Sequence, residues 1–346
     1  MGRQDTIHAV SFQNFGKLKS FQADSFSGLN LVIGENGCGK TFFLKGLYSA
    51  VKAAEEYKRG DDVRSYADIL AEKLRWTFQV ESLGDMVSKS ASEPLGFSME
   101  LGDEKIAYHF SRSAKVDIGK DITPPKNGRE ANSVFIPAKE ILSLYSVILK
   151  SREIDRSFGF DDTYYDLAKA LRVAPTKGKN YQAFAGCRER LSAIIGGKVD
   201  MDRESGKWYY RNLNKEKFSI GATSEGIKKL SILDRLLGNR YLDGHSIVFI
   251  DELESALHPT AICEFLDVLS LLSREMGIQF FISSHSYFVV KKLALIAAQD
   301  PGAVQCIALD SDGGSLAVDL HDGLPDNAII NTSIRLYEEE LEAALP

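Results

Sequence analysis

The sequence predicts an α/β protein built around a mixed sheet that contains parallel strands. Two observations lead to this fold class: a strand, loop and helix at residues 29–54, and a strand, helix and strand at residues 247–282. Parallel strands joined by helices form a sheet that is covered on both faces. The 346 residues, 44% of them hydrophobic, allow two domains or one large α/β domain with insertions.

A phosphate-binding loop lies in the first unit, where residues 34–41 read GENGCGKT. The apolar run 29–33 precedes it as a buried strand, and residues 44–54 follow with the spacing of one apolar helical face. Lys40 is expected to bridge the β- and γ-phosphates, and the Thr41 hydroxyl to bind Mg²⁺. This flanking context argues against a chance match in a glycine-rich turn. The predicted nucleotide-binding residues are Gly34, Glu35, Asn36, Gly37, Cys38, Gly39, Lys40 and Thr41.

Two acids end the apolar strand 247–250. Asp251 is placed to hold Mg²⁺, directly or through water, and Glu252 to deprotonate the water that attacks the γ-phosphate. A strand that ends in solvated acids is the alternative, but P-loop chemistry needs an acid on a second strand. After an amphipathic helix and the strand 278–282, His285 can hydrogen-bond the γ-phosphate or the attacking water. The alternative for His285 is a histidine that is merely satisfied at a strand terminus.

Composition and charge limit the classes of protein to which this chain can belong. The net charge of −6 argues against a chain coated with phosphate-binding side chains, so nucleic acid would need a local basic groove. Four cysteines far apart, with no CxxC pair, suggest reduced thiols and neither a zinc site nor a disulfide framework. No run of about eighteen apolar residues is present, nor a signal-peptide layout. We therefore expect a cytoplasmic protein without a membrane partner.

Ser224 opens a helix with an apolar face at residues 227–237. A Ser at this position is usually an N-cap. However, the order of P-loop, Ser-x-Gly helix start, acid pair, Ser-Ala-Leu-His-Pro and strand-end histidine resembles the ABC-type ATPases. That resemblance implies a signature motif with Ser224 and Gly226, a catalytic base Glu252, a D-loop with Ser255 and a switch histidine His285.

Within that superfamily the chain is similar to the SMC, RecF and OLD-type branch. Residues 10–16 resemble its opening strand and Asn-Phe turn, and the P-loop has the Glu-Asn pair common there. Leu-His-Pro at 257–259 and Ser-Glu-Gly replace the transporters' Leu-Asp and Ser-Gly-Gly. Leu253 stands where a Pro usually follows the acid pair. No Q-loop glutamine is found, and the strand 134–136 with residues 137–140 after it takes the place of the Q-loop.

Between the P-loop and the signature lies an insertion. It has no heptads sustained over three or four repeats, which excludes long coiled-coil arms. The tetrapeptide NKEK at 214–217 is predicted as a solvated turn, since its fourth residue lacks the carboxylate that reads guanine. The other predicted elements are a hairpin around Gly102-Asp103, helices within 140–195, a hairpin around Ser205-Gly206, and loops at 119–132 and 175–180.

After His285 we predict a helix at 287–298, a hairpin around residues 312–314 and an acidic helix at the end of the sequence. Glu338 to Glu340 in this helix are expected to be a solvated face. OLD-type relatives often carry a nuclease after the histidine, and this segment is too short for one. The predicted divisions are an N-terminal ATPase lobe 1–80, an insertion of hairpins and a helical lid 81–214, an ATPase core 215–310 and a C-terminal hairpin and helix 311–346.

The resemblance implies an ATPase with ATP and Mg²⁺ that closes as a homodimer around ATP. Its ATP state would act on a separate effector protein, such as a nuclease, in phage defence or DNA repair. One alternative is an assembly scaffold that holds ATP with little turnover. Another is the nucleotide-binding subunit of a transporter, which the signature, the Leu-His-Pro and the long insertion disfavour.

Overall fold

The computed structural model describes residues 5–174, 182–202 and 204–344. The strands are β1 Ile7–Phe15, β2 Leu18–Ala23, β3 Leu29–Gly34, β4 Leu95–Leu101, β5 Glu104–Phe110, β6 Ile122–Thr123, β7 Val134–Ile136, β8 Gly197–Met201, β9 Trp208–Asn212, β10 Lys217–Ser219, β11 Ile247–Ile250, β12 Gln279–Ser284, β13 Val304–Leu309 and β14 Ser315–Asp319. The helices are α1 Lys40–Glu56, α2 Tyr66–Phe78, α3 Tyr145–Glu153, α4 Asp162–Arg172, α5 Gln182–Ile195, α6 Glu225–Gly238, α7 Pro259–Met276, α8 Tyr287–Gln299 and α9 Ala328–Ala344, with short 3₁₀ helices η1 Leu83–Met86 and η2 Ile220–Ala222.

A six-stranded sheet forms the centre, in the order β14-β13-β3-β12-β11-β7. The strands from β13 to β7 run parallel, and β14 pairs antiparallel with β13. Leu31 and Ile33 face one side of this sheet, and Val32 between them faces the other. Both faces of β3 are therefore buried, as its apolar residues Leu29, Leu31, Val32 and Ile33 predict. The predicted fold class, a mixed α/β sheet, is confirmed.

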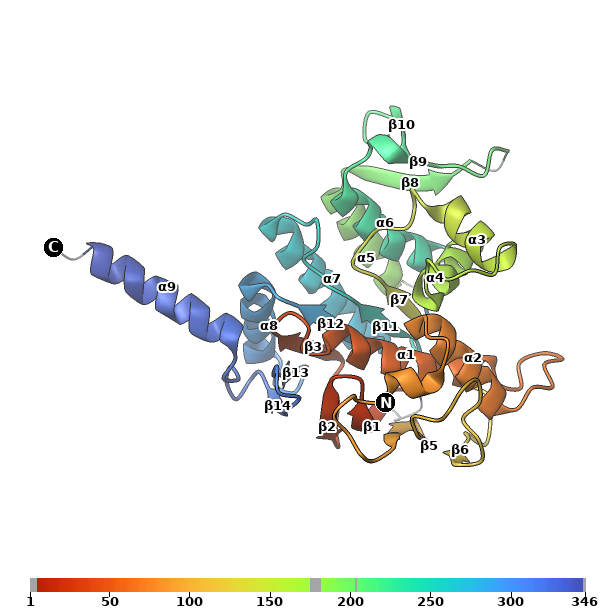
Figure 1. Ribbon diagram of the computed structural model, residues 1–346. Coiled ribbons are helices and arrows are strands. Elements are labelled where there is room, and N and C mark those ends of the chain that lie inside the picture. Colours follow the sequence, from red (N-terminus) through yellow and green to blue (C-terminus); the bar gives the residue numbers. More distant parts are fainter. Residues whose placement is uncertain (1–4, 175–181, 203, 345–346) are drawn as a thin grey trace.

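Helix α1 lies between two sheets. Its buried residues pack against the central sheet and also against the antiparallel sheet β2-β1-β4-β5-β6. The other face of the central sheet is covered by helices that include α6, α7 and α8 (Figure 1). Since α1 follows the loop 34–41 directly, this double packing fixes the position of the loop.

The insertion contributes α3, α4, α5 and the three-stranded sheet β10-β9-β8. Ion pairs hold α4 against the helices beside it. Lys45 of α1 lies 2.6 Å from Asp161, the N-cap of α4, and buried Lys73 of α2 lies 2.9 Å from Asp162 and 3.0 Å from Asp166. The helical part of the insertion is thus joined to α1 and α2 by ion pairs.

The two hairpins predicted within the insertion are confirmed as β4–β5 and β8–β9, and the predicted helical section contains α3, α4 and α5. The prediction for residues 119–132 is wrong in part, because β6 pairs there with β5. The prolines at 124 and 125 follow β6 directly, and proline cannot donate to a strand ladder, so the strand is short. The loop predicted at 175–180 lies outside the described residues.

The solvated turn predicted at 214–217 holds for residues 214–216, whereas Lys217 begins β10 and pairs with Arg211. The side chain of Asn212 bonds both the backbone and the carboxylate of Glu216, which closes the turn one residue early. After His285, the predicted helix and hairpin are confirmed as α8 and β13–β14.

The acidic helix predicted near residue 340 is α9, and it extends away from the rest of the molecule (Figure 1). Glu338, Glu339 and Glu340 are exposed, as predicted. Among the described residues, no helix is long and apolar enough to span a membrane.

Candidate functional site

The loop 34–41 connects β3 to α1 with a sharply turned backbone. Gly39, the N-cap of α1, has φ 110°, a conformation that side-chain-bearing residues rarely adopt. Buried Lys40 donates hydrogen bonds to the carbonyls of Gly34 at 2.9 Å and Glu35 at 2.8 Å. Burial lowers the pKa of Lys40. The lysine ammonium is therefore held within the loop whose amides are to receive phosphate.

Other loop residues differ in exposure. Glu35, Asn36 and Gly37 are exposed, and Cys38 is buried with its sulfur 3.8 Å from Lys40 Nζ. The Cys38 side chain packs in the apolar cluster around α1, so only the backbone of Cys38 is available to contact a ligand.

Thr41 and Asp251 come together from opposite sides of β12. The Thr41 hydroxyl donates to both carboxylate oxygens of Asp251, at 3.1 and 3.2 Å. Ser283 Oγ donates to Asp251 Oδ1 at 2.6 Å and so orients the carboxylate. The structure thus places the two predicted magnesium-binding residues at one point, 210 positions apart in sequence.

Glu252 sits in a turn that is fixed through its backbone. Its φ of 45° is unusual for a residue with a side chain. Its N–H donates to Ser283 Oγ at 2.8 Å, and its carbonyl accepts from Lys229 Nζ at 2.6 Å. Among the described residues, no hydrogen bond involves the Glu252 carboxylate. This side chain is therefore available to act on a substrate.

His285 follows β12, and its position depends on Glu254. One carboxylate oxygen of Glu254 accepts the backbone N–H of His285 at 2.6 Å, and the other accepts the Ser284 hydroxyl at 2.8 Å. The predicted switch histidine is therefore clamped to the segment that follows the acid pair.

Ser224 and Gly226 lie at the start of α6, and Gly226 approaches Ala256, the residue after Ser255. Ser224 is the exposed N-cap of α6, and its side chain accepts from Ile227 N at 3.4 Å. A Cβ added to Gly226 would lie 2.7 Å from the Ala256 carbonyl oxygen, so glycine is required for this close approach. Within the described residues, no hydrogen bond or ion pair joins Ser224 or Gly226 to the loop 34–41. The predicted signature thus approaches the predicted D-loop at Ala256, apart from the loop 34–41 of the same chain.

The strand predicted in place of a Q-loop lies beside the acid pair. β7 pairs parallel with β11, and Asp251 N donates to Ile136 O at 2.9 Å. Just beyond β7, Glu140 lies 3.4 Å from Lys228 of α6. The end of β7 is thus connected both to the acid-bearing strand and to the helix that Ser224 begins.

A family model described as "AAA domain, putative AbiEii toxin, Type IV TA system" matches residues 29–291, which include all of the residues described above. The chain belongs to this family. It is an ATPase, and the family implies that it binds nucleotide. No curated protein matches the sequence.

A solved structure of an SMC head shares the fold of this ATPase. The Smc head domain with an extended coiled coil bound to the C-terminal domain of ScpA, derived from Pyrococcus furiosus, is 13% identical, with a TM-score of 0.51 over 97% of this chain and 99% of that chain. The SMC head domain from Thermotoga maritima is 15% identical, with a TM-score of 0.46 over 91% of this chain and 98% of that chain. The Pyrococcus furiosus head therefore shows that this ATPase has the fold predicted from the resemblance to the SMC-like branch.

Three residues of this ATPase site were missed by the sequence analysis: Lys229, Glu254 and Ser283. Ser283 is a polar residue at the end of an otherwise apolar strand, beside the predicted histidine. Glu254 stands close after the acid pair. These positions are the signals that could have identified both residues. Lys229 gave a weaker signal, because the second of two adjacent lysines on a helix is ordinarily solvated. The structure buries it instead, and burial lowers its pKa to about 8.

Lys229 links the two halves of the site. It belongs to α6, which Ser224 begins, and its ammonium donates to the carbonyls of Glu252 at 2.6 Å and Asp251 at 3.3 Å. Lys229 thus joins α6 to the turn that carries the predicted base. We expect it to act as a positioning residue, through the backbone of Glu252.

We expect Lys229→Met to lower kcat about tenfold, because a small displacement of a catalytic group is costly in rate. KM should stay near the wild-type value, since the phosphate-binding loop is untouched. Steady-state ATPase kinetics measure both constants. Lys228→Met is the matched control, because Lys228 pairs with Glu140 and Glu225 instead. Equal kcat values for the two variants, with equal melting temperatures, would contradict this role.

Proposed function

We propose that the chain binds ATP and Mg²⁺ at the loop 34–41. Lys40 would neutralise the β- and γ-phosphates, and the loop amides with the start of α1 would surround them. Thr41 and Asp251 would hold Mg²⁺, which takes oxygen ligands and usually keeps phosphate oxygens and waters as well. The direct contact between these two residues supports this assignment. Mg²⁺ would offset the charge of the phosphate oxygens.

We further propose that two copies close head to tail around ATP. The observation that carries this is the division of the site: Lys40, Thr41 and Asp251 form one half, and exposed Ser224 with Gly226 forms another half that does not touch it. An exposed helix N-terminus is suited to receive the γ-phosphate of a second molecule. Glu252 would deprotonate the attacking water, and His285 would hydrogen-bond the γ-phosphate or that water.

ATP would then act as a switch for a separate effector protein. The family description names a toxin–antitoxin system, which favours a defence role over DNA repair. The Pyrococcus furiosus Smc head is bound to a domain of ScpA, which supports a protein partner for a head of this fold. A nuclease is the effector class we propose, in keeping with a DNA-related process.

Lys40→Ala is expected to weaken ATP binding about 10- to 100-fold, because a hydrogen bond to a charged group contributes about 1.5–3 kcal/mol. Equilibrium titration with a fluorescent ATP analogue measures the affinity. Thermal unfolding of the same samples serves as the control, since Lys40 also bonds the carbonyls of Gly34 and Glu35. Unchanged affinity in a folded variant would remove Lys40 from the site.

Dimerisation has its own measurement. Light scattering behind a sizing column should give the monomer mass for the wild type without nucleotide, and the dimer mass with ATP and Mg²⁺. The Lys40→Ala variant should remain monomeric in both samples. A wild-type mass that does not change with ATP would overturn the head-to-tail proposal while leaving ATP binding intact.

A further inference from the structure

Helix α9 exposes apolar side chains that no other described element covers. Of its residues, Ala328–Ala344, only Ile330 is buried. Ile334, Tyr337 and Leu341 are 52%, 61% and 44% exposed. Figure 1 shows the helix extending away from the sheets, so most of its length has no neighbour. A contiguous apolar surface of this kind marks an interaction site.

The exposed residues form a single stripe. From Ile330 through Ile334, Tyr337 and Leu341, the intervals are four, three and four, which is the a/d spacing of a helix that packs along a partner helix. Ile330, which is buried, continues the same spacing toward the body of the protein. Leu336 is equally exposed, at 56%, but lies off this stripe. We call Ile334, Tyr337 and Leu341 the α9 stripe.

Acidic residues flank the α9 stripe on both sides. Glu338 and Glu340 occupy the positions next to it that correspond to e and g of a heptad, and both are exposed. An antiparallel second copy of α9 would place glutamates opposite glutamates, which is unfavourable. A partner with lysine or arginine at the matching positions would instead form ion pairs there. The charges therefore disfavour an antiparallel second copy of this chain and favour a basic partner.

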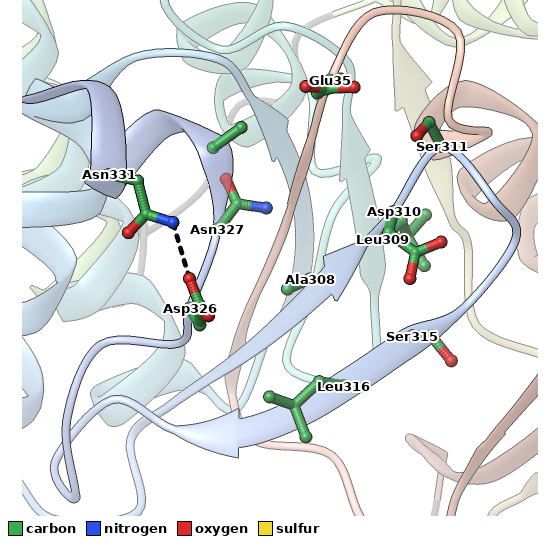
Figure 2. Close-up of a pocket in the computed structure, with 11 residues that line it drawn as sticks. Glu35, Ala308, Leu309, Asp310, Ser311, Ser315, Leu316, Asp326, Asn327 and Asn331 are labelled. Carbon is green, nitrogen blue, oxygen red and sulfur yellow. Dashed lines mark hydrogen bonds between the residues drawn. The ribbon is translucent and has the colours of Figure 1, made fainter.

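The base of α9 lies beside the nucleotide site. A cavity of about 420 Å³ is lined by Asn327 and Asn331, by the ends of β13 and β14, and by Glu35 of the loop 34–41 (Figure 2). Asn331 donates to Asp326 at 2.7 Å, which fixes the first turn of α9 at the cavity. A partner on α9 would thus be attached to a segment that borders the phosphate-binding loop.

We propose that the α9 stripe docks a partner protein through an amphipathic helix with basic flanks. This inference rests on the proposed function, because it assigns a docking site to the effector that the ATPase controls. The apolar residues supply the contact area, and Glu338 and Glu340 select the charge of the partner. The helix-to-helix mode follows from the a/d spacing of the stripe.

The test uses the full chain and a synthetic peptide of about three heptads, with Leu at a and d and Lys at e and g. Fluorescence anisotropy at low salt should show saturable binding to the wild type. Ile334→Ser combined with Tyr337→Ser should weaken it about tenfold or more, because two anchors leave the contact. Leu336→Ser is the matched control, and it should leave binding unchanged. Added salt should weaken binding to the wild type.

Three outcomes would overturn the proposal. The first is equal binding of a peptide with Glu in place of Lys, which would remove the charge selection. The second is equal loss in Leu336→Ser, which would make the contact nonspecific. The third is self-association of the wild type through α9 in sedimentation velocity without nucleotide, which would assign the stripe to a second copy. ATP-dependent dimerisation, measured by light scattering, should persist in the double variant, so a failure of the proposed ATP dimer is seen separately.

Discussion

Replacing Glu252 with glutamine is expected to slow ATP hydrolysis by roughly 10²–10⁴, the contribution of a positioned general base, while ATP affinity stays at the wild-type level. The structure explains why this change is selective. The turn at Glu252 is held by its backbone N–H on Ser283 and its carbonyl on Lys229, and glutamine keeps both. The substitution thus removes the basic oxygen and leaves the geometry of the turn in place.

Single-turnover hydrolysis of radiolabelled ATP measures the rate, and light scattering measures the mass of the same sample. With hydrolysis slowed, the ATP-bound dimer should persist through the sizing column. Glu254→Gln is an informative comparison, because Glu254 positions His285 and Ser284 and is not placed to deprotonate water. Hydrolysis at the wild-type rate in Glu252→Gln would reassign the base.

The sequence predicted the central sheet well because its strands carry strong local signals. Residues 31–33 and 247–250 are continuous apolar runs that end in a glycine-rich loop and in two acids, and both features are local. Parallel strands end at the same edge of a sheet, so the approach of Thr41 to Asp251 follows from the order of the motifs. In the structure a hydrogen bond joins the two side chains.

What the sequence did not reveal depends on contacts between distant segments. From its sequence, Lys229 is expected to be a solvated lysine, and only the packing of α6 against the turn at Glu252 shows otherwise. The pairing of β6 with β5 involves only two residues before a pair of prolines, which is too short to give a strand pattern. The hydrophobic periodicity of a sequence does not predict that α9 extends away from the body, because this depends on the absence of a neighbour within the described chain. In each case the deciding interaction lies outside the local pattern.

Ser224→Arg separates a signature motif from an ordinary helix cap. As a cap, the Ser224 side chain accepts one long hydrogen bond from Ile227 N, at 3.4 Å, and losing such a cap costs about 0.5–2 kcal/mol of stability. Because Ser224 is exposed, arginine fits without disturbing the core. In the head-to-tail dimer, however, its side chain would occupy the space of the partner's triphosphate. We therefore expect ATP binding to persist while ATP-dependent dimerisation and hydrolysis are lost, with Ser224→Ala as the control for the cap alone.

Mixing two inactive variants gives the decisive measurement. A heterodimer of Ser224→Arg with Lys40→Ala joins the intact phosphate-binding loop of one chain to the intact signature of the other. Up to one working site per heterodimer is then restored, although neither variant hydrolyses ATP by itself. Recovery of ATPase activity on mixing requires that Ser224 acts on the nucleotide held by the other copy, because no site within either chain is complete. Full activity of Ser224→Arg on its own would show that the exposed serine is only a cap, and the dimer mechanism would have to be abandoned.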